Sequence, residues 1–123
     1  MNLNAEQKAA AEVTSRHALI LAGPGTGKTT ALVGRYAELL KRDVPPSSIL
    51  CCTFARKAAD ELKGRIKSST GIATSKLPIG TFHSLANRAV KELAPLLGIE
   101  PPTDVLRENI RRKIITEIRD ANE

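Results

Sequence analysis

Apolar residues along the chain form two kinds of pattern, short continuous runs and stripes that repeat every three or four positions. A continuous run bounded by glycine or proline is typical of a buried strand, and a repeating stripe is typical of a helix. The expected strands cover residues 17–22, 48–54 and 77–81. The expected helices cover residues 4–13, 27–41, 55–67 and 82–97, and residues 68–75 are expected to form a loop.

Strands and helices alternate in this pattern, and the strand segments are almost entirely apolar. Such alternation predicts an α/β fold in which helices cover both faces of a parallel sheet. A last helix, capped at Thr103 or Asp104, is expected beyond the break at Pro101 and Pro102. Its apolar stripe needs a partner, which is either the sheet domain or a piece absent from this chain. The stripe comprises Leu106, Ile110, Ile114, Ile115 and Ile118.

Composition narrows the class of protein. The 123 residues fit one domain, and a hydrophobic content of 41% is enough for a core. The net charge of +6 favours a polyanion such as nucleic acid as partner, with a merely soluble basic protein as the alternative. Cys51 and Cys52 are adjacent, so a strand would point them to opposite faces and we expect free thiols. With no visible signal peptide, membrane span or Cys/His metal spacing, we expect a reduced, cytoplasmic protein.

A glycine-rich stretch, AGPGTGKTT over residues 22–30, joins the first expected strand to the helix that follows. It matches the phosphate-binding loop G-x-x-x-x-G-K-[ST] except at its first position, where Ala22 stands. Main-chain N–H groups of such a loop converge on a nucleotide phosphate at the helix N-terminus. Lys28 is expected to reach the β- and γ-phosphate oxygens, and the Thr29 hydroxyl to ligate Mg²⁺. The alternative is a plain glycine-rich turn before a helix.

The acids that hydrolysis requires are not evident. One acid must hold Mg²⁺ and another must orient water, and both usually lie at the end of a later strand. Asp60 and Glu61 lie inside an expected helix with no apolar strand before them. Glu117 follows two isoleucines, but these belong to the stripe of the last helix. The chain therefore resembles the opening segment of an ATPase without its Walker B acids.

Four blocks in this order closely resemble the N-terminal part of UvrD/Rep/PcrA-type superfamily 1 DNA helicases, with AddA- and RecB-type relatives sharing the same opening. The resemblance covers nearly the whole chain and is more specific than the loop alone. It implies the N-terminal part of a RecA-like motor domain over residues 1–102, followed by the first helix of an inserted subdomain over residues 103–123. The blocks are LNAEQ (3–7), AGPGTGKT (22–29), TFARKAADEL (53–62) and TFHSLA (81–86).

The resemblance implies an ATP site with Mg²⁺. In the family a glutamine before the first strand hydrogen-bonds adenine, and Gln7 matches it; an amide both donates and accepts, as the edge of adenine requires. Gln7 is also placed to close a capping box with Asn4, and the two roles are compatible. Relatives often carry Arg where this chain has Thr30, so adenine affinity is expected to be weaker or supplied by another residue. The implied contacts are Gln7, Gly23, Gly25, Thr26, Gly27, Lys28, Thr29 (with Mg²⁺) and Thr30.

The third and fourth blocks are implied to contact single-stranded DNA. Hydroxyl groups and cations suit phosphates, and an aromatic ring can stack on a base. Many relatives have Asn where this chain has Arg56, which puts amide-specific contacts in doubt but adds positive charge. The alternatives place Phe54 in the core and Arg56 in solvent, and make His83 either structural or simply exposed. The matching positions are Thr53, Phe54, Arg56, Lys57, Thr81 and His83.

The predicted parent is therefore an ATP-dependent DNA helicase that moves 3′ to 5′ on single-stranded DNA and unwinds duplex junctions. Its remaining domains are missing from this chain, which alone is expected to bind ATP weakly and to be inactive. Two other classes of protein remain open. One is a small P-loop kinase or NTPase with an unrecognised acid. The other is a non-catalytic nucleic-acid-binding module derived from a helicase.

Overall fold

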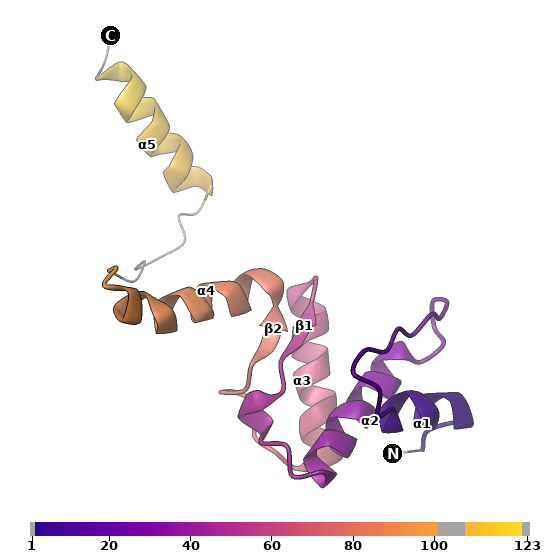
Figure 1. The fold of residues 1–123 in the computed structure, drawn as a ribbon. Helices are drawn as coiled ribbons and strands as arrows, with labels where there is room; N and C mark the ends of the chain where they lie inside the picture. Colours follow the sequence, from indigo (N-terminus) through magenta and orange to yellow (C-terminus); the bar gives the residue numbers. More distant parts are fainter. Residues whose placement is uncertain (1, 101–107, 122–123) are drawn as a thin grey trace. The chain divides into compact units, whose positions relative to one another are not determined.

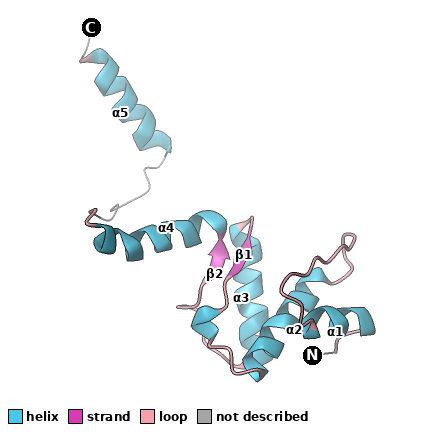
Figure 2. Cartoon of the chain, in the orientation of Figure 1, coloured by secondary structure: helices cyan, strands magenta, loops and turns pink. Residues whose placement is uncertain are grey.

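A computed structural model describes residues 2–100 and 108–121. Contacts divide the chain into two compact units, residues 1–86 and residues 87–123, and each is described by itself. The elements of the described chain follow one another as Figures 1 and 2 show. They are α1 (Ala5–Glu12), α2 (Lys28–Lys41), the 3₁₀ turn η1 (Pro46–Ser48), β1 (Cys51–Thr53), α3 (Arg56–Thr70), β2 (Ile79–Thr81), α4 (Phe82–Leu93), the 3₁₀ turn η2 (Ala94–Leu97) and α5 (Glu108–Asp120).

The sheet of the described chain consists of β1 and β2, which pair in parallel. Cys51 lies opposite Ile79, and Thr53 lies opposite Thr81. Helix α3 connects the two strands and lies along them (Figure 1). Because the strands are parallel, their carboxyl ends meet at one edge, where the third and fourth sequence blocks begin.

The core lies between α2, α3 and one face of this sheet. Helix α3 contributes Leu62 and Ile66, four positions apart and therefore on one helical face. Helix α2 contributes Val33 and Tyr36, and the sheet contributes Ile79 beside Cys51 and Ile49. Stripe positions that the sequence assigns to helices thus form the apolar interior, and the α/β class with a parallel sheet is confirmed.

The strand predicted over residues 17–22 is wrong. These residues have no regular structure and pair with neither β1 nor β2. Leu19 is 83% exposed and Leu21 is 86% exposed, so the run is not buried either. A strand is stabilised by hydrogen bonds to a neighbouring strand, and no described segment of this chain provides one along this run. Apolar composition alone therefore did not produce a strand here.

The prediction that helices cover both faces of the sheet is also wrong along β1. Leu50 is 67% exposed and Cys52 is exposed, whereas Cys51 on the opposite face is buried in the core. Both thiols are free and point to opposite faces, as predicted.

None of the helices in the described part of the chain has the length and apolar character that a membrane-spanning helix needs.

The other boundaries agree with the sequence to within a few residues. Helix α3 runs to Thr70, three residues into the predicted loop, and ends at Gly71 with a positive φ of 74°. Helix α4 ends at Leu93, and the 3₁₀ turn Ala94–Leu97 follows with Gly98 as its C-cap. The expected caps of the last helix and Leu106 lie outside the described residues. In α5 the predicted stripe is exposed, and its members are Ile110, Ile114, Ile115 and Ile118.

Candidate functional site

The glycine-rich loop between residues 22 and 27 leads directly into α2. Gly25 and Gly27 adopt positive φ values of 75° and 86°, a region that favours glycine, and Gly27 is the N-cap of the helix. The Thr26 hydroxyl donates a hydrogen bond to the Gly23 carbonyl oxygen at 2.7 Å, which closes the turn. The loop geometry therefore requires the glycines at these two positions and places main-chain N–H groups at the start of a helix, the arrangement that binds anions.

Lys28, the first residue of α2, folds back over the loop. Its Nζ donates hydrogen bonds to the carbonyl oxygens of Ala22 at 3.0 Å and Gly23 at 2.5 Å. The side chain is exposed, so an incoming phosphate can reach the ammonium group. A phosphate would exchange these two neutral acceptors for charged oxygens, which form stronger hydrogen bonds with an ammonium group.

Gln7 on α1 contacts the same loop. Its Nε2 donates a hydrogen bond to the Thr26 carbonyl oxygen at 3.3 Å. The capping box with Asn4 is present: Gln7 N donates to Asn4 Oδ1, and Asn4 N donates to Gln7 Oε1. Gln7, Thr26, Gly27 and Lys28 line one cavity of about 410 Å³. The structure therefore places Gln7, the predicted adenine contact, and Lys28, the predicted phosphate contact, on the wall of one cavity, although they are distant in sequence.

Gly27 is constrained by Gln7 as well as by its φ angle. A Cβ atom at position 27 would overlap Nε2 of Gln7. By contrast, a Cβ atom at Gly25 would meet no atom within 4 Å. The main chain at Gly27 is therefore packed against Gln7, whereas the space beside Gly25 is open to a ligand that approaches the main chain closely.

Other predicted nucleotide residues are not brought into this cavity. Thr30 lines a separate cavity of about 660 Å³ between α2 and α3, together with Val33 and Arg65. Thr29 is exposed at the second position of α2, where its hydroxyl is accessible to a metal–nucleotide complex. Within residues 2–100 and 108–121, no group of three or more His, Cys, Asp or Glu side chains could hold a metal ion. For a bound Mg²⁺, the chain thus offers the Thr29 hydroxyl, and nucleotide phosphates would have to supply further oxygens.

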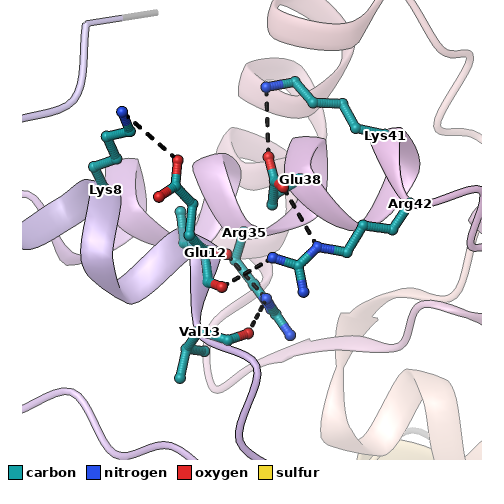
Figure 3. Close-up of polar contacts among 8 residues, drawn as sticks. Lys8, Glu12, Val13, Arg35, Glu38, Lys41 and Arg42 are labelled. Atoms are coloured by element: carbon teal, nitrogen blue, oxygen red, sulfur yellow. Dashed lines mark hydrogen bonds and ion pairs between the residues drawn. The ribbon is translucent and has the colours of Figure 1, made fainter.

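Arg35 of α2 and Arg42, the C-cap residue of that helix, hold α1 in place (Figure 3), and neither has a role predicted from the sequence. Arg35 Nη1 donates to the carbonyl oxygens of Ala11 at 3.0 Å and Val13 at 2.6 Å. Arg42 Nη2 donates to the carbonyl oxygen of Glu12 at 2.9 Å. The partners are 22 to 30 positions apart in sequence, so no local pattern announces the contacts.

Glu38 completes the polar cluster in Figure 3. Its carboxylate accepts hydrogen bonds from Lys41 and from Arg42, each at 3.4 Å. Desolvation raises the pKa of Glu38, but these hydrogen bonds and the nearby positive charges outweigh it, so the net shift is downward. The carboxylate thus remains charged and orients Arg42 toward α1.

The predicted DNA residues gather where the parallel strands end. Phe54, the residue after β1, is 98% exposed, so its alternative placement in the core is wrong. Arg56 and Lys57 at the start of α3 are exposed. Thr53 is half-buried, and its hydroxyl donates to the Ala55 carbonyl oxygen at 3.0 Å. An exposed ring beside two exposed cations is an arrangement that can bind a single strand through its bases and phosphates.

Thr81 and His83, from the fourth block, lie in different environments. Thr81 is 8% exposed, and its Oγ1 accepts a hydrogen bond from Ser84 N at 3.2 Å, the bond typical of a helix N-cap. Thr81, Ser84 and Arg56 line a small cavity of about 220 Å³, which joins the two predicted DNA blocks. His83 is exposed, and its ring lies edge-on to that of Phe82, with the centroids 6.3 Å apart. Ser84 was missed, although its position three residues after Thr81 is a readable capping signal.

Comparison with known proteins identifies the family of helicase N-terminal domains to which the chain belongs. Residues 3–123 match the UvrD/REP helicase N-terminal domain family, and the chain belongs to that family. It is 36% identical over 118 residues to the ATP-dependent DNA helicase PcrA of Staphylococcus epidermidis RP62A, covering 95% of this chain and 16% of that relative. It is 35% identical over 118 residues to the PcrA helicase of Staphylococcus aureus Mu50, with the same coverage. The chain thus spans about a sixth of the length of the relatives it matches.

Proposed function

We propose that this chain is the ATP-binding N-terminal segment of a DNA helicase with a RecA-like motor. The observation that carries the proposal is the cavity shared by Gln7 and Lys28, in which α1 and the glycine-rich loop meet. Gln7 would contact the adenine edge, the loop N–H groups would hold the phosphates, and Lys28 would neutralise charge on the γ-phosphate. Thr29 would contribute its hydroxyl to Mg²⁺.

Bound Mg²⁺ would supply positive charge that polarises the terminal phosphate and neutralises the charge that develops during its transfer. The residues of this chain would bind and orient the nucleotide. Among the acidic residues of the described chain, Glu6 alone lines the cavity that contains Lys28. Glu6 is an exposed residue in the first turn of α1, where its charge favours the helix N-terminus. We therefore propose that the chain alone binds nucleotide but does not hydrolyse it.

Titration calorimetry of the 123-residue chain with ATP and Mg²⁺ tests the nucleotide site. Saturable heat at micromolar to millimolar ATP is expected, and Lys28→Ala should weaken it at least about tenfold, the loss of one charge-assisted bond. Lys91→Ala, which removes an exposed lysine of α4, is the matched control and should leave affinity unchanged. Absence of heat at millimolar ATP would contradict the proposal. A measurable hydrolysis rate that Lys28→Ala abolishes would contradict the proposed need for further acids.

We further propose that the edge formed by the ends of β1 and β2 contacts single-stranded DNA. The exposed ring of Phe54 and the exposed cations Arg56 and Lys57 support this proposal. Transfer of phosphate to a small molecule, without any effect of DNA, would instead favour a small kinase. Salt-dependent binding of single-stranded DNA that is independent of ATP would favour a non-catalytic binding module.

A further inference from the structure

Helix α1 holds Gln7 against the loop at one end, and its other end is bound by side chains of α2. The eight residues of α1 are too few to form a stable helix alone in water. Its last turn contains no basic residue of its own, although the terminal carbonyl groups of a helix need hydrogen-bond donors and favour positive charge. Arg35 meets both needs, with bonds of 3.0 and 2.6 Å to Ala11 and Val13 (Figure 3).

Close packing also holds α1 against α2. Gly34, the residue before Arg35, allows α1 to approach the α2 main chain. A Cβ atom at Gly34 would lie 2.8 Å from Leu3 Cδ1 and 3.3 Å from Ala11 Cβ. Ala11 and Ala31 are 2% and 3% exposed, so this contact is well packed. Gly34 and Arg35 therefore act together, one by removing bulk and the other by supplying donors.

The strengths of the contacts decide which one positions Gln7. The Gln7–Thr26 hydrogen bond is neutral, exposed and long at 3.3 Å, whereas the bonds of Arg35 are charge-assisted and part-buried. The single amide bond is therefore too weak to hold α1 by itself. Gln7 and Ala11 are one helical turn apart, about 6 Å along the axis, so a tilt at Arg35 moves the amide of Gln7.

We infer that Arg35 is a positioning residue for base recognition: it orients α1 so that the Gln7 amide faces the adenine end of the nucleotide cavity. Arg35 itself does not line the cavity that Gln7 and Lys28 share. This inference rests on the proposed adenine contact of Gln7. It predicts that loss of Arg35 weakens recognition of the base and leaves the grip on phosphates intact.

The test compares the affinity of the full 123-residue chain for ATP with its affinity for inorganic tripolyphosphate, by calorimetry with Mg²⁺. Arg35→Gln should lower ATP affinity about 5- to 10-fold, the size of one lost hydrogen bond, and leave tripolyphosphate affinity unchanged. Gln7→Ala should have the same selective effect. The double variant with Arg35→Gln and Gln7→Ala should bind ATP no more weakly than Gln7→Ala alone, since both substitutions remove the same contact with the base.

Three further variants separate positioning from general damage. Arg65→Gln removes an arginine that pairs within α3 with Glu61 and should change neither affinity. Arg35→Lys keeps a donor and a positive charge and should restore part of the ATP affinity. Gly34→Ala keeps every charge but sets a new Cβ 3.3 Å from Ala11 Cβ, so α1 must shift by a few tenths of an ångström. It should give a smaller loss with the same selectivity, even if Arg35→Gln fails to fold.

The outcomes distinguish this inference from the proposed function on which it rests. If Arg35→Gln lowers both affinities equally, or its effect adds to that of Gln7→Ala, the positioning role is refuted. If Gln7→Ala is selective but Arg35→Gln and Gly34→Ala are not, the positioning role alone fails. If Gln7→Ala leaves both affinities unchanged, the adenine contact fails, and the role of Arg35 fails with it.

Discussion

Replacement of Gly27 by alanine should cost more stability than the same change at Gly25, although both glycines have positive φ. The left-handed conformation costs an alanine roughly 1–2 kcal/mol, and the lower entropy of the unfolded alanine chain offsets about 0.4–1 kcal/mol of this. Gly25→Ala has only these two effects, because no atom lies within 4 Å of the new Cβ. We therefore expect Gly25→Ala to lower the free energy of unfolding by about 0.5–1 kcal/mol.

Gly27→Ala adds the displacement of Gln7. Its new methyl group overlaps Gln7 Nε2, the far end of a flexible side chain, so the amide turns away and gives up its bond to the Thr26 carbonyl. One neutral bond is worth about 0.5–1.5 kcal/mol, which predicts a stability difference of that size between the two glycine variants. Urea unfolding followed by circular dichroism measures it, with a midpoint difference of about 0.3–1 M for an m-value near 1.5 kcal/mol/M.

The control is the same pair of substitutions in a Gln7→Ala background. Without the amide, the methyl group at position 27 no longer overlaps the side chain at position 7. The two glycine substitutions should then lower the free energy of unfolding by nearly equal amounts. Equal costs in the presence of Gln7 would refute the contact between α1 and the loop. A difference that persists unchanged without Gln7 would assign the cost of Gly27→Ala to another cause.

Three further predictions concern the DNA edge and the core. Phe54→Ala should change the free energy of unfolding by less than about 0.5 kcal/mol, because the ring is exposed. The same variant should weaken binding of single-stranded DNA by about 1–3 kcal/mol in a fluorescence anisotropy titration. A large loss of stability would contradict the exposure of the ring. Arg56→Gln should reduce the slope of log affinity against log salt concentration by about 0.7, while Arg65→Gln should not; equal slopes for both would remove Arg56 from the interface. Burial raises the pKa of the Cys51 thiol above its usual value, and burial together with the nearby Cys51 raises the pKa of the Tyr36 hydroxyl. As the pH rises, both groups ionise in the unfolded state before they ionise in the folded state, so the free energy of unfolding should be full below about pH 8 and fall past about pH 9. Cys51→Ala should move that fall to higher pH. An unchanged pH profile of stability in this variant would contradict the buried thiol.

The sequence predicted those elements whose determinants lie close together in the chain. The capping box of Asn4 and Gln7 marks the start of α1, and Gly27 before Lys28 marks the start of α2. The glycine-rich loop was also predictable, since its turn depends on Gly25 and Gly27 themselves. Local signals of this kind act over three to five residues, which is the range that helix caps and turns require.

Features that depend on distant partners could not be predicted in the same way. Residues 17–22 have strand-like composition, but strand formation depends on a neighbour that the run itself cannot specify. Arg35 resembles any basic residue on a helix until its partners on α1 are known. Phe54 follows a strand, where an aromatic ring fits either a core or a binding surface, and its 98% exposure decides between them.

The wrong prediction of a strand over residues 17–22 changes the physical account of the candidate nucleotide site. We expected a central strand to anchor the loop, whereas in this structure the loop is held by Gln7, by the bonds of Lys28 to Ala22 and Gly23, and by its continuity with α2. The family assignment stands on the sequence comparison and does not depend on that strand. A loop whose entering segment lacks strand pairing must lose conformational freedom when it closes on a phosphate, at about 1–2 kcal/mol for each residue that becomes ordered. We therefore expect the proposed nucleotide binding by this chain to be weak, because the residues before the loop are not paired with a strand.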